Sequence, residues 1–221
     1  ASNTINLNVG LAPGSLMFIY GEGLSETTSE MRHAPGYPLN LPLSIAGVYV
    51  TFDTEDGISV PGRLLFVSDR QVNVQIPWEL AGYNGAWVKV VNNSFPTLVR
   101  WLPLTVAAPQ IFQYFEPDKM DYAVAQSADD WSYITPGAPA RRGQWIVLYG
   151  NGFGPLRENQ PATGETTNGQ LAETLFPVTV TVGGRPAEIY YAGLQPEYVG
   201  LYQLNIRIPD DAPLGPEQPI V

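Results

Sequence analysis

The chain has 221 residues and carries 21 acidic against 11 basic side chains, which gives a formal net charge of -10 at pH 7. This balance would repel a phosphate backbone, so we expect no nucleic-acid partner. The absence of cysteine excludes disulfides and thiolate chemistry, and no apolar run approaches the ~20 residues of a membrane span, so membrane insertion is not expected.

Turn-forming residues are frequent, with 22 glycines and 21 prolines, whereas charged residues make up only 14% of the chain. Such a balance is typical of many short strands joined by tight turns. No stretch shows the long amphipathic periodicity of a surface helix. The composition therefore predicts an all-β protein.

The first predicted strands lie in the N-terminal third of the chain. Residues 5–9 alternate weakly, and residues 16–20 form a continuous apolar run, which predicts a strand buried in the core. Residues 25–42 form a loop that holds the only histidine, His33. Long loops on a rigid scaffold often carry binding surfaces. Further strands are predicted at residues 48–52 and 63–67.

The stretch at residues 71–77 has the clearest strand pattern. Val72, Val74 and Ile76 alternate with polar residues, which predicts a strand with one buried face. Pro77 cannot donate a hydrogen bond and therefore closes the strand. A hairpin is predicted next, from residues 86–91 and 98–106 with its turn at Asn92 and Asn93.

A second series of strands is predicted beyond residue 109. Residues 122–125 and 131–134 read as a hairpin, and residues 145–149 read as a core strand with Trp145 packed inside. A second long loop follows at residues 155–175. The last elements before the end of the series are a strand at residues 178–182, a tight turn at Gly183 and Gly184, and a strand at residues 188–191.

The two series share their motifs. Residues 203–209 repeat the pattern of residues 71–77 at an offset of 132, and Tyr20, Gly21 and Gly23 return as Tyr149, Gly150 and Gly152. This repetition predicts two tandem domains, residues 1–108 and residues 109–221, each with its own core. Val221 falls where the second copy of the hairpin should begin. We therefore expect the second domain to lack its last one or two strands and to leave an unpaired edge.

Several of these motifs carry a resemblance to known families. The clearest are Ala140-Arg141-Arg142-Gly143, Tyr149-Gly150-Asn151-Gly152, Tyr191-Ala192-Gly193-Leu194 and Gly200-Leu201-Tyr202-Gln203-Leu204-Asn205. They resemble an uncharacterised bacterial family at the C-terminal ends of large secreted acidobacterial proteins. Each half is also similar to TIG/IPT domains, which are immunoglobulin-like sandwiches. The resemblance implies two tandem immunoglobulin-like β-sandwiches, a secreted or cell-surface location, and no catalytic residues.

Aromatic residues are the first candidates for a binding site, with five tryptophans and twelve tyrosines in the chain. Trp78, Trp87, Trp101 and Trp131 fall near predicted strand ends or in hairpins, where indole rings could stack on sugar faces or on another protein. Alternatively, these rings cap the open ends of the sandwiches and fill the domain junction. Tyr190 and Tyr191 should face opposite sides of their strand, so we expect one of them to be exposed.

Acidic residues are the second group of candidates. Asp53, Glu55 and Asp56 could hold calcium through their oxygens, although they lack the spacing and the distal glutamate of a dedicated calcium loop. The alternative is a solvated turn in which aspartate caps the backbone. Acidic pairs elsewhere leave open a carboxylate-based glycoside hydrolase. These pairs are Asp129 with Asp130 and Asp210 with Asp211.

Two further patterns fail as catalytic or cofactor motifs. Gly150, Gly152 and Gly154 have the spacing of a dinucleotide fingerprint, but Pro155 stands where a phosphate-binding helix should begin. A tight turn with positive φ explains them better. His33 is not accompanied by a Gly-x-Ser-x-Gly motif. We therefore expect no catalytic residues and no cofactor.

The sequence thus favours a non-catalytic extracellular accessory or adhesive module of a larger exported bacterial protein. In this interpretation the protein is a spacer or offers a binding surface, with a polysaccharide or another surface protein as its partner. A carbohydrate-binding module that uses exposed aromatic rings is the main alternative, and the glycoside hydrolase is the remote one.

Overall fold

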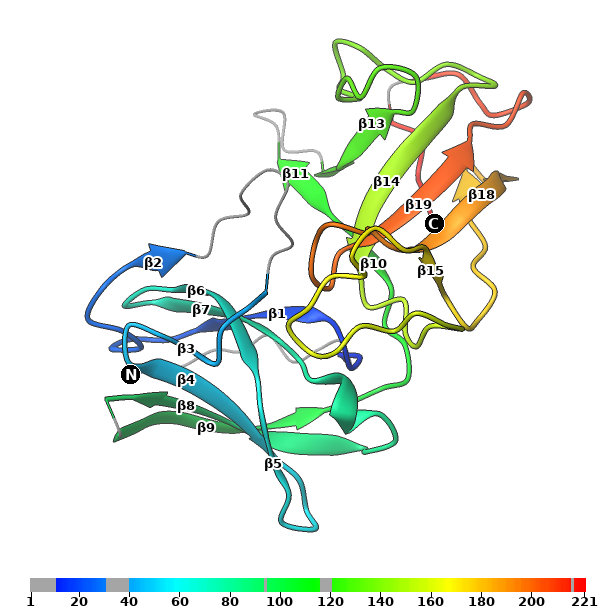
Figure 1. Ribbon diagram of the computed structural model, residues 1–221. Coiled ribbons are helices and arrows are strands. Elements are labelled where there is room, and N and C mark those ends of the chain that lie inside the picture. The colour runs from blue at the N-terminus through cyan, green and yellow to red at the C-terminus, as the bar shows by residue number, and fades with distance from the viewer. Residues whose placement is uncertain (1–10, 31–39, 94, 116–120, 216) are drawn as a thin grey trace.

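The computed structural model describes residues 11–30, 40–93, 95–115, 121–215 and 217–221. These residues form β-strands and one short 3-10 helix, Trp78–Leu80, so the predicted all-β fold is confirmed. The first half of the chain lies at the lower left of Figure 1 and the second half at the upper right. Two expectations fall outside the described residues, namely the strand at residues 5–9 and the position of His33. Within the described ranges, no helix has the length and apolar character needed to span a membrane.

The first half is a sandwich of two antiparallel sheets. Its core contains Ile19 and Val74 from one sheet and Phe52 and Val88 from the other, all inaccessible to solvent. The first sheet has the order β1 (Leu16–Tyr20), β7 (Gln71–Gln75), β6 (Arg63–Val67) and β2 (Ser29–Glu30). The second has the order β3 (Ser44–Ile45), β4 (Val48–Asp53), β8 (Gly85–Asn92) and β9 (Phe95–Pro103), with β5 (Ser59–Pro61) beside β4.

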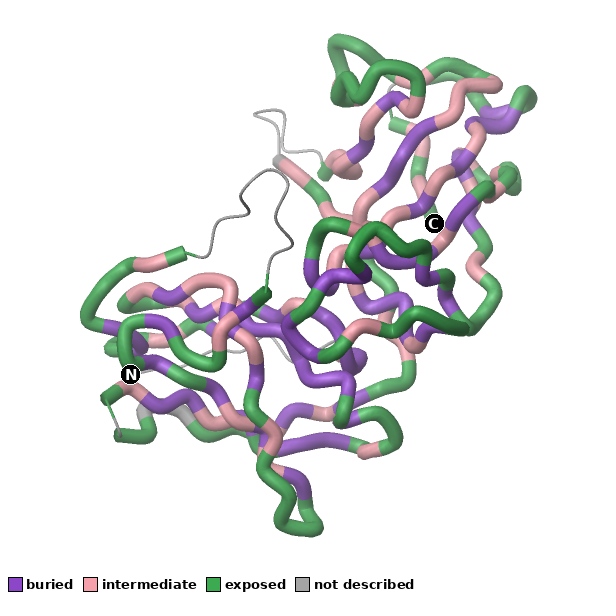
Figure 2. The backbone as a smooth tube through the Cα atoms, viewed as in Figure 1, coloured by how far each residue is buried: buried purple, intermediate pink, exposed green. Residues whose placement is uncertain are grey.

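The second half is built around one large sheet and two small hairpins. The large sheet has the order β10 (Gln110–Ile111), β14 (Trp145–Asn151), β19 (Tyr202–Arg207), β18 (Glu188–Leu194) and β15 (Ala172–Glu173), with β13 (Ala125–Ser127) also paired to β14. The hairpins are β11 (Gln113–Phe115) with β12 (Asp121–Ala123), and β16 (Thr181–Val182) with β17 (Arg185–Pro186). Figure 2 shows that buried segments run along the strands of both halves, while the outer turns are exposed.

The repeated motifs occupy equivalent places in the two halves. The order β1-β7-β6-β2 matches the order β14-β19-β18-β15. Leu16 lies opposite Gln75 in the first pair of central strands, as Trp145 lies opposite Arg207 in the second. Each copy also has a register shift at the same point of its third strand, between Leu64 and Phe66 in β6 and between Ile189 and Tyr191 in β18. The placement of a domain boundary at residue 108 stays a prediction.

The Gln-x-Asn pattern of the repeated strand has a local explanation. The Gln71 side-chain amide donates to Asn73 Oδ1 at 2.7 Å, and Gln203 donates to Asn205 at 2.8 Å. Residues two apart lie on the same face of a strand, so each pair forms a hydrogen bond along the outer face of its sheet. The same sequence thus produces the same contact in both halves.

Two predictions about burial were wrong, and one about pairing was only partly right. Phe18 and Tyr20 are 46% and 50% exposed although residues 16–20 read as fully buried, because only one face of β1 covers the core. Trp145 is not a core residue. Its ring lies on the outer face, 6.2 Å from that of Tyr190. Tyr122 pairs with β11 instead of with residues 131–134. Residues 131–134 turn back on residues 125–127, where Ile134 N–H donates to the Ala125 carbonyl at 3.0 Å and Gln126 lies opposite Tyr133.

The two halves are joined by specific contacts as well as by the chain. Trp78 comes from the first half but belongs to the core of the second. The Gln75 side chain is fully buried and accepts a hydrogen bond from Gly164 N–H at 2.6 Å. Thr163 Oγ1 accepts from Trp78 N–H at 2.9 Å. The loop at residues 155–175, expected to offer a binding surface, thus supplies residues to the junction.

Candidate binding face

An aromatic pair stands on the outer face of the sheet formed by β4, β8 and β9. Trp87 in β8 lies directly opposite Trp101 in β9. Their ring centroids are 5.5 Å apart at an interplanar angle of 65°, which is an edge-to-face contact. Trp87 is 47% exposed, and Trp101 is partly exposed. The structure therefore brings two of the four candidate tryptophans together.

Strand alternation explains why these rings face solvent. Ala86, Val88 and Val90 are buried in the core of the first half. Successive side chains of a strand point to opposite sides, so Trp87 and Lys89 must lie on the outer side of the sheet. The sequence of β8 fixes both the core contacts and the composition of the outer face.

An ion pair lies beside the aromatic pair. Asp53 in β4 stands opposite Trp87, and its Oδ2 is 2.7 Å from Lys89 Nζ. Ser59 Oγ donates a second hydrogen bond to Asp53 at 2.5 Å. Burial alone would raise the pKa of the Asp53 carboxyl, but the hydrogen bonds from Lys89 and Ser59 and the charge of Lys89 outweigh it. The pKa of Asp53 therefore lies below its ordinary value.

Two further apolar side chains extend this surface. Val99 lies opposite Lys89 and is 42% exposed, and Tyr49 is 39% exposed on the same side of β4. We call the set of Tyr49, Asp53, Trp87, Lys89, Val99 and Trp101 the β4–β8–β9 face. It offers aromatic rings for apolar contacts, together with a carboxylate and an ammonium group for hydrogen bonds. Tyr49 and Lys89 were not among the sequence candidates, although the alternation of residues 86–91 places Lys89 on the same side as Trp87.

The other two candidate tryptophans lie elsewhere. Trp78 is only 6% exposed and packs in the core of the second half, where its ring is too deep to stack on a ligand. Trp131 is 58% exposed in a turn of the second half, with φ at 61°. The burial of Trp78 therefore agrees with the alternative interpretation, in which tryptophans fill the junction between the two halves.

The acidic loop after β4 is organised by its own side chains. Thr54 Oγ1 donates to the carboxylate of Asp56 and accepts from Ile58 N–H at 3.1 Å. Tyr83 OH donates to Asp56 Oδ2 at 3.1 Å. The hydrogen bond from Thr54 is the main reason why the pKa of Asp56 is lowered. Among the residues that the structure describes, no three histidine, aspartate or glutamate side chains are grouped as a metal site would require.

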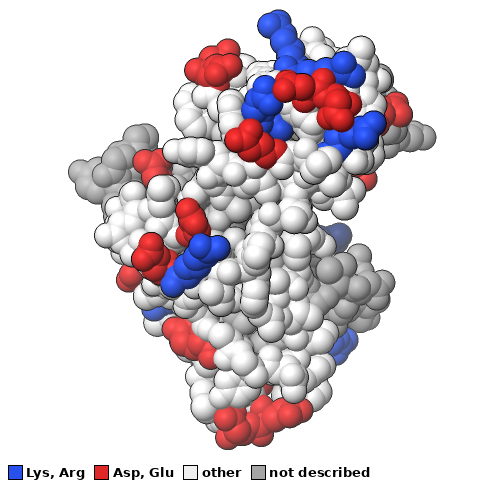
Figure 3. Space-filling model, turned by 90° about the vertical axis from the view of Figure 1, so that its right-hand side faces the viewer, with Lys and Arg blue, Asp and Glu red and all other residues white. Residues whose placement is uncertain are grey.

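The charge distribution separates the two ends of the molecule. In Figure 3, acidic side chains gather at the lower end, where Figure 1 places the β4–β5 hairpin. Acidic and basic side chains are mixed at the upper end, over the second half, and again in a smaller group at the left of the middle. Known proteins offer no guide to the site. Comparison with family models, with curated proteins and with solved structures finds no match.

One more exposed aromatic residue lies on the second half. Tyr190 is 80% exposed whereas Tyr191 is 6% exposed, which confirms that the two neighbours face opposite sides of β18. The Tyr191 OH donates to the Leu194 carbonyl at 2.7 Å, so its hydroxyl group is hydrogen-bonded inside the protein. Tyr190 contacts Trp145 edge to face. An ion pair lies beside these rings as well, because Arg207 stands opposite Trp145 and its Nη2 is 3.0 Å from Asp210 Oδ1. The Asp210 side chain is 71% exposed, whereas that of Asp53 is 28% exposed, so the Asp53–Lys89 pair is the better shielded of the two.

Proposed function

We propose that the protein is a non-catalytic binding module that holds a polysaccharide on the β4–β8–β9 face. The observation that carries this proposal is the contact between Trp87 and Trp101 beside the Asp53–Lys89 ion pair. A flat sugar ring has an apolar C–H face and a rim of hydroxyl groups. Indole rings match the C–H face, and the carboxylate and ammonium groups match the hydroxyl groups.

The ion pair favours a sugar over a purely apolar protein partner. Asp53 and Lys89 keep free hydrogen-bonding capacity in addition to their mutual contact, because a carboxylate accepts several bonds and an ammonium donates three. Covering them with an apolar surface would leave that capacity unmet, at a cost in free energy. Hydroxyl groups would satisfy it. The favoured ligands are polysaccharides with equatorial hydroxyl groups, because the axial C–H bonds of their sugar rings then form an uncovered apolar face.

The same observations do not favour a hydrolase. A general acid needs a carboxyl group whose pKa is raised towards the working pH. The pKa of Asp53 is shifted the other way by Lys89 and Ser59. Asp53 is suited to accept hydrogen bonds from a ligand, and its pairing supports a binding role.

The wider setting of the module follows from the sequence resemblance. We place it in a larger exported bacterial protein, secreted or on the cell surface, as a tandem pair of TIG/IPT-like domains. The junction contacts at Gln75 and Trp78 support a stiff arrangement of the two halves. Such a module would also act as a spacer that presents the β4–β8–β9 face at a fixed distance.

Binding to insoluble cellulose, chitin and xylan, and to a soluble β-glucan, tests the proposal. The full chain should bind at least one of these polysaccharides, and Trp87→Ala should weaken that binding by about tenfold or more. Trp131→Ala is the matched control, because it removes an exposed tryptophan from the second half and should leave binding unchanged. Absence of binding to all four, or equal binding by Trp87→Ala, would contradict the proposed function.

A further inference from the structure

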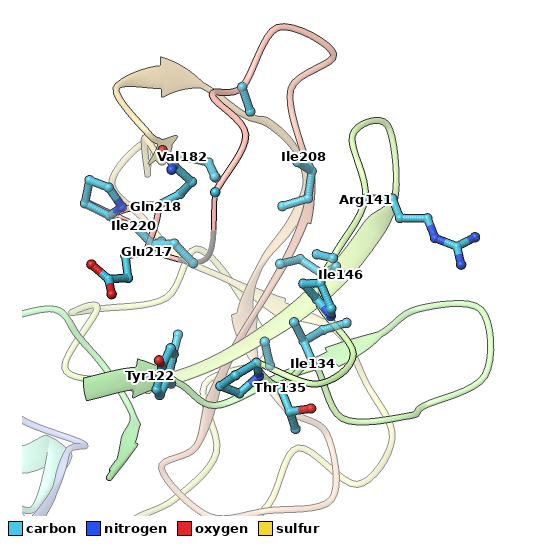
Figure 4. A pocket seen from close by; sticks show the side chains of 18 of the residues that line it. Tyr122, Ile134, Thr135, Arg141, Ile146, Val182, Ile208, Glu217, Gln218 and Ile220 are labelled. Carbon is cyan, nitrogen blue, oxygen red and sulfur yellow. The ribbon is translucent and has the colours of Figure 1, made fainter. Parts of the chain in front are cut away.

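The second half contains a large apolar cavity, of about 1020 Å³, on the inner side of its main sheet. Figure 4 shows Ile134, Ile146 and Ile208 on one side of it and Val182, Gln218 and Ile220 on the other. Ile146 comes from β14 and Ile208 follows β19, so the cavity borders the core of this half. A space of this size next to a core is unusual, since protein interiors are close-packed.

The first half shows what fills the equivalent space there. By the register of the repeat, Met17 and Ile76 are the counterparts of Ile146 and Ile208. Both are buried in a core that also contains Val90 of β8 and Leu102 of β9. The strands β8 and β9 therefore cover in the first half the region that is open in the second.

Residues 219–221 pair with β16 in the second half as the first part of β8 pairs with β4 in the first half. Ile220 pairs with Val182 in an antiparallel bridge, as Val88 of β8 pairs with Phe52 of β4. Ile220 stands 132 residues after Val88, which is the offset of the repeated motif. The pairing of residues 219–221 with β16 is therefore equivalent to the pairing of the first part of β8 with β4. Val221 takes the position of Lys89.

The strand partner of this segment is correspondingly short. Residues 178–182 were predicted as one strand, but only Thr181–Val182 forms a ladder. Val221 and Thr181 exchange both backbone hydrogen bonds, at 2.8 and 3.1 Å. In an antiparallel pair such double bonds recur at every second residue, so the next one would involve Thr179. A continuation of the strand beyond Val221 would supply it.

We propose that this cavity is a docking site for a β-hairpin of the β8–β9 type, which extends the pairing that residues 219–221 make with β16. The hairpin pairs with residues 178–180 through its backbone and inserts alternate apolar side chains between Ile146, Ile208 and Val182. Its pattern is that of residues 90–104, in which Val90, Leu102 and Leu104 are buried. The occupant is thus a polypeptide hairpin with this alternation of apolar side chains, which completes the second sheet independently of any ligand on the β4–β8–β9 face.

An extended chain tests this proposal directly. Residues 90–104 are appended after Val221, so that a copy of the second part of β8 and of β9 follows in register. Amide hydrogen exchange at Thr179 should slow by about tenfold or more, because the new strand accepts its hydrogen bond. The fluorescence of an added apolar dye, which reports the open cavity, should fall at the same time.

A second extended chain serves as the matched control. Its appended copy carries serine in place of Val90, Leu102 and Leu104, which keeps the length and the turn but removes the buried side chains. This version should leave exchange at Thr179 as fast as in the original chain. Unchanged exchange in the first extended chain, or equal protection in the serine version, would overturn the proposal. Protection of Thr179 in the original chain on dimerisation would also overturn it, because a second copy would then be the occupant.

Discussion

The side-chain amide of Asn151 binds the backbone of Leu16 through both of its ends. Asn151 Oδ1 accepts from Leu16 N–H at 3.2 Å, and Asn151 Nδ2 donates to the Leu16 carbonyl at 2.7 Å. The amide thereby makes the two hydrogen bonds that the backbone of a neighbouring strand would make with the first residue of β1. Because β14 and β1 are equivalent strands of the repeat, this contact ties the two copies to each other.

Replacing Asn151 with alanine should weaken the junction. The change leaves a partly buried N–H and C=O of Leu16 without their partner, which costs about 1–3 kcal/mol of unfolding free energy. Urea denaturation followed by tryptophan fluorescence measures the loss. Asn84→Ala, at an exposed position, should change stability by less than about 0.5 kcal/mol. Equal stabilities of the two variants would show that the contact contributes nothing.

Gly14 and Gly23 form a second matched pair. Both have positive φ, at 82° and 69°, but a Cβ on Gly14 would lie 2.2 Å from Trp78 Cη2, whereas a Cβ on Gly23 would meet nothing within 4 Å. Gly23→Ala should therefore cost about 1 kcal/mol of unfolding free energy from backbone strain alone. Gly14→Ala adds overpacking against the indole ring and should cost about 3 kcal/mol. Thermal unfolding of the two variants measures both losses of unfolding free energy. Similar losses would show that the Trp78 ring does not lie against Gly14.

Much of this fold can be predicted from the repeated motifs. Two copies of one alternating strand, each closed by proline, predict the same central pairing, and Gly183 with Gly184 predicts the tight turn between β16 and β17. The exposure of Phe18 could not be predicted, because an apolar run does not reveal whether one or both faces of a strand are covered. The junction contact of Gln75 with Gly164 left no signal either, since its partners are far apart in the sequence.

The pairing of Asp53 with Lys89 gives stability a specific pH dependence. The pKa of Asp53 is lower in the folded protein than in the unfolded chain, so its contribution is present above the unfolded pKa and is lost as pH falls through the folded pKa. Lys89→Met should move the Asp53 titration to higher pH. Carboxyl NMR signals measured against pH give the midpoint. Arg70→Met, at the exposed Asp69 pair, should leave that midpoint in place, and an unmoved midpoint in Lys89→Met would contradict the assignment.

The candidate site was only partly visible in the sequence. Trp87 and Trp101 stood out as tryptophans in a hairpin, but their contact depends on the register of β8 and β9, which shifts between Val90 and Val91. Turn residues alone do not specify such a shift. The separation of Trp87 from Trp78, nearby in sequence but buried in the junction, likewise depends on tertiary packing.

The indole N–H signals of the five tryptophans report most directly on the β4–β8–β9 face. We would record them by NMR during titration with soluble β-glucan oligosaccharides, or with fragments of whichever polysaccharide the binding assay selects. We predict that the Trp87 and Trp101 signals shift together with saturation, while those of Trp78 and Trp131 stay in place. A saturable shift confined to Trp131, or binding without any shift at Trp87 and Trp101, would contradict it.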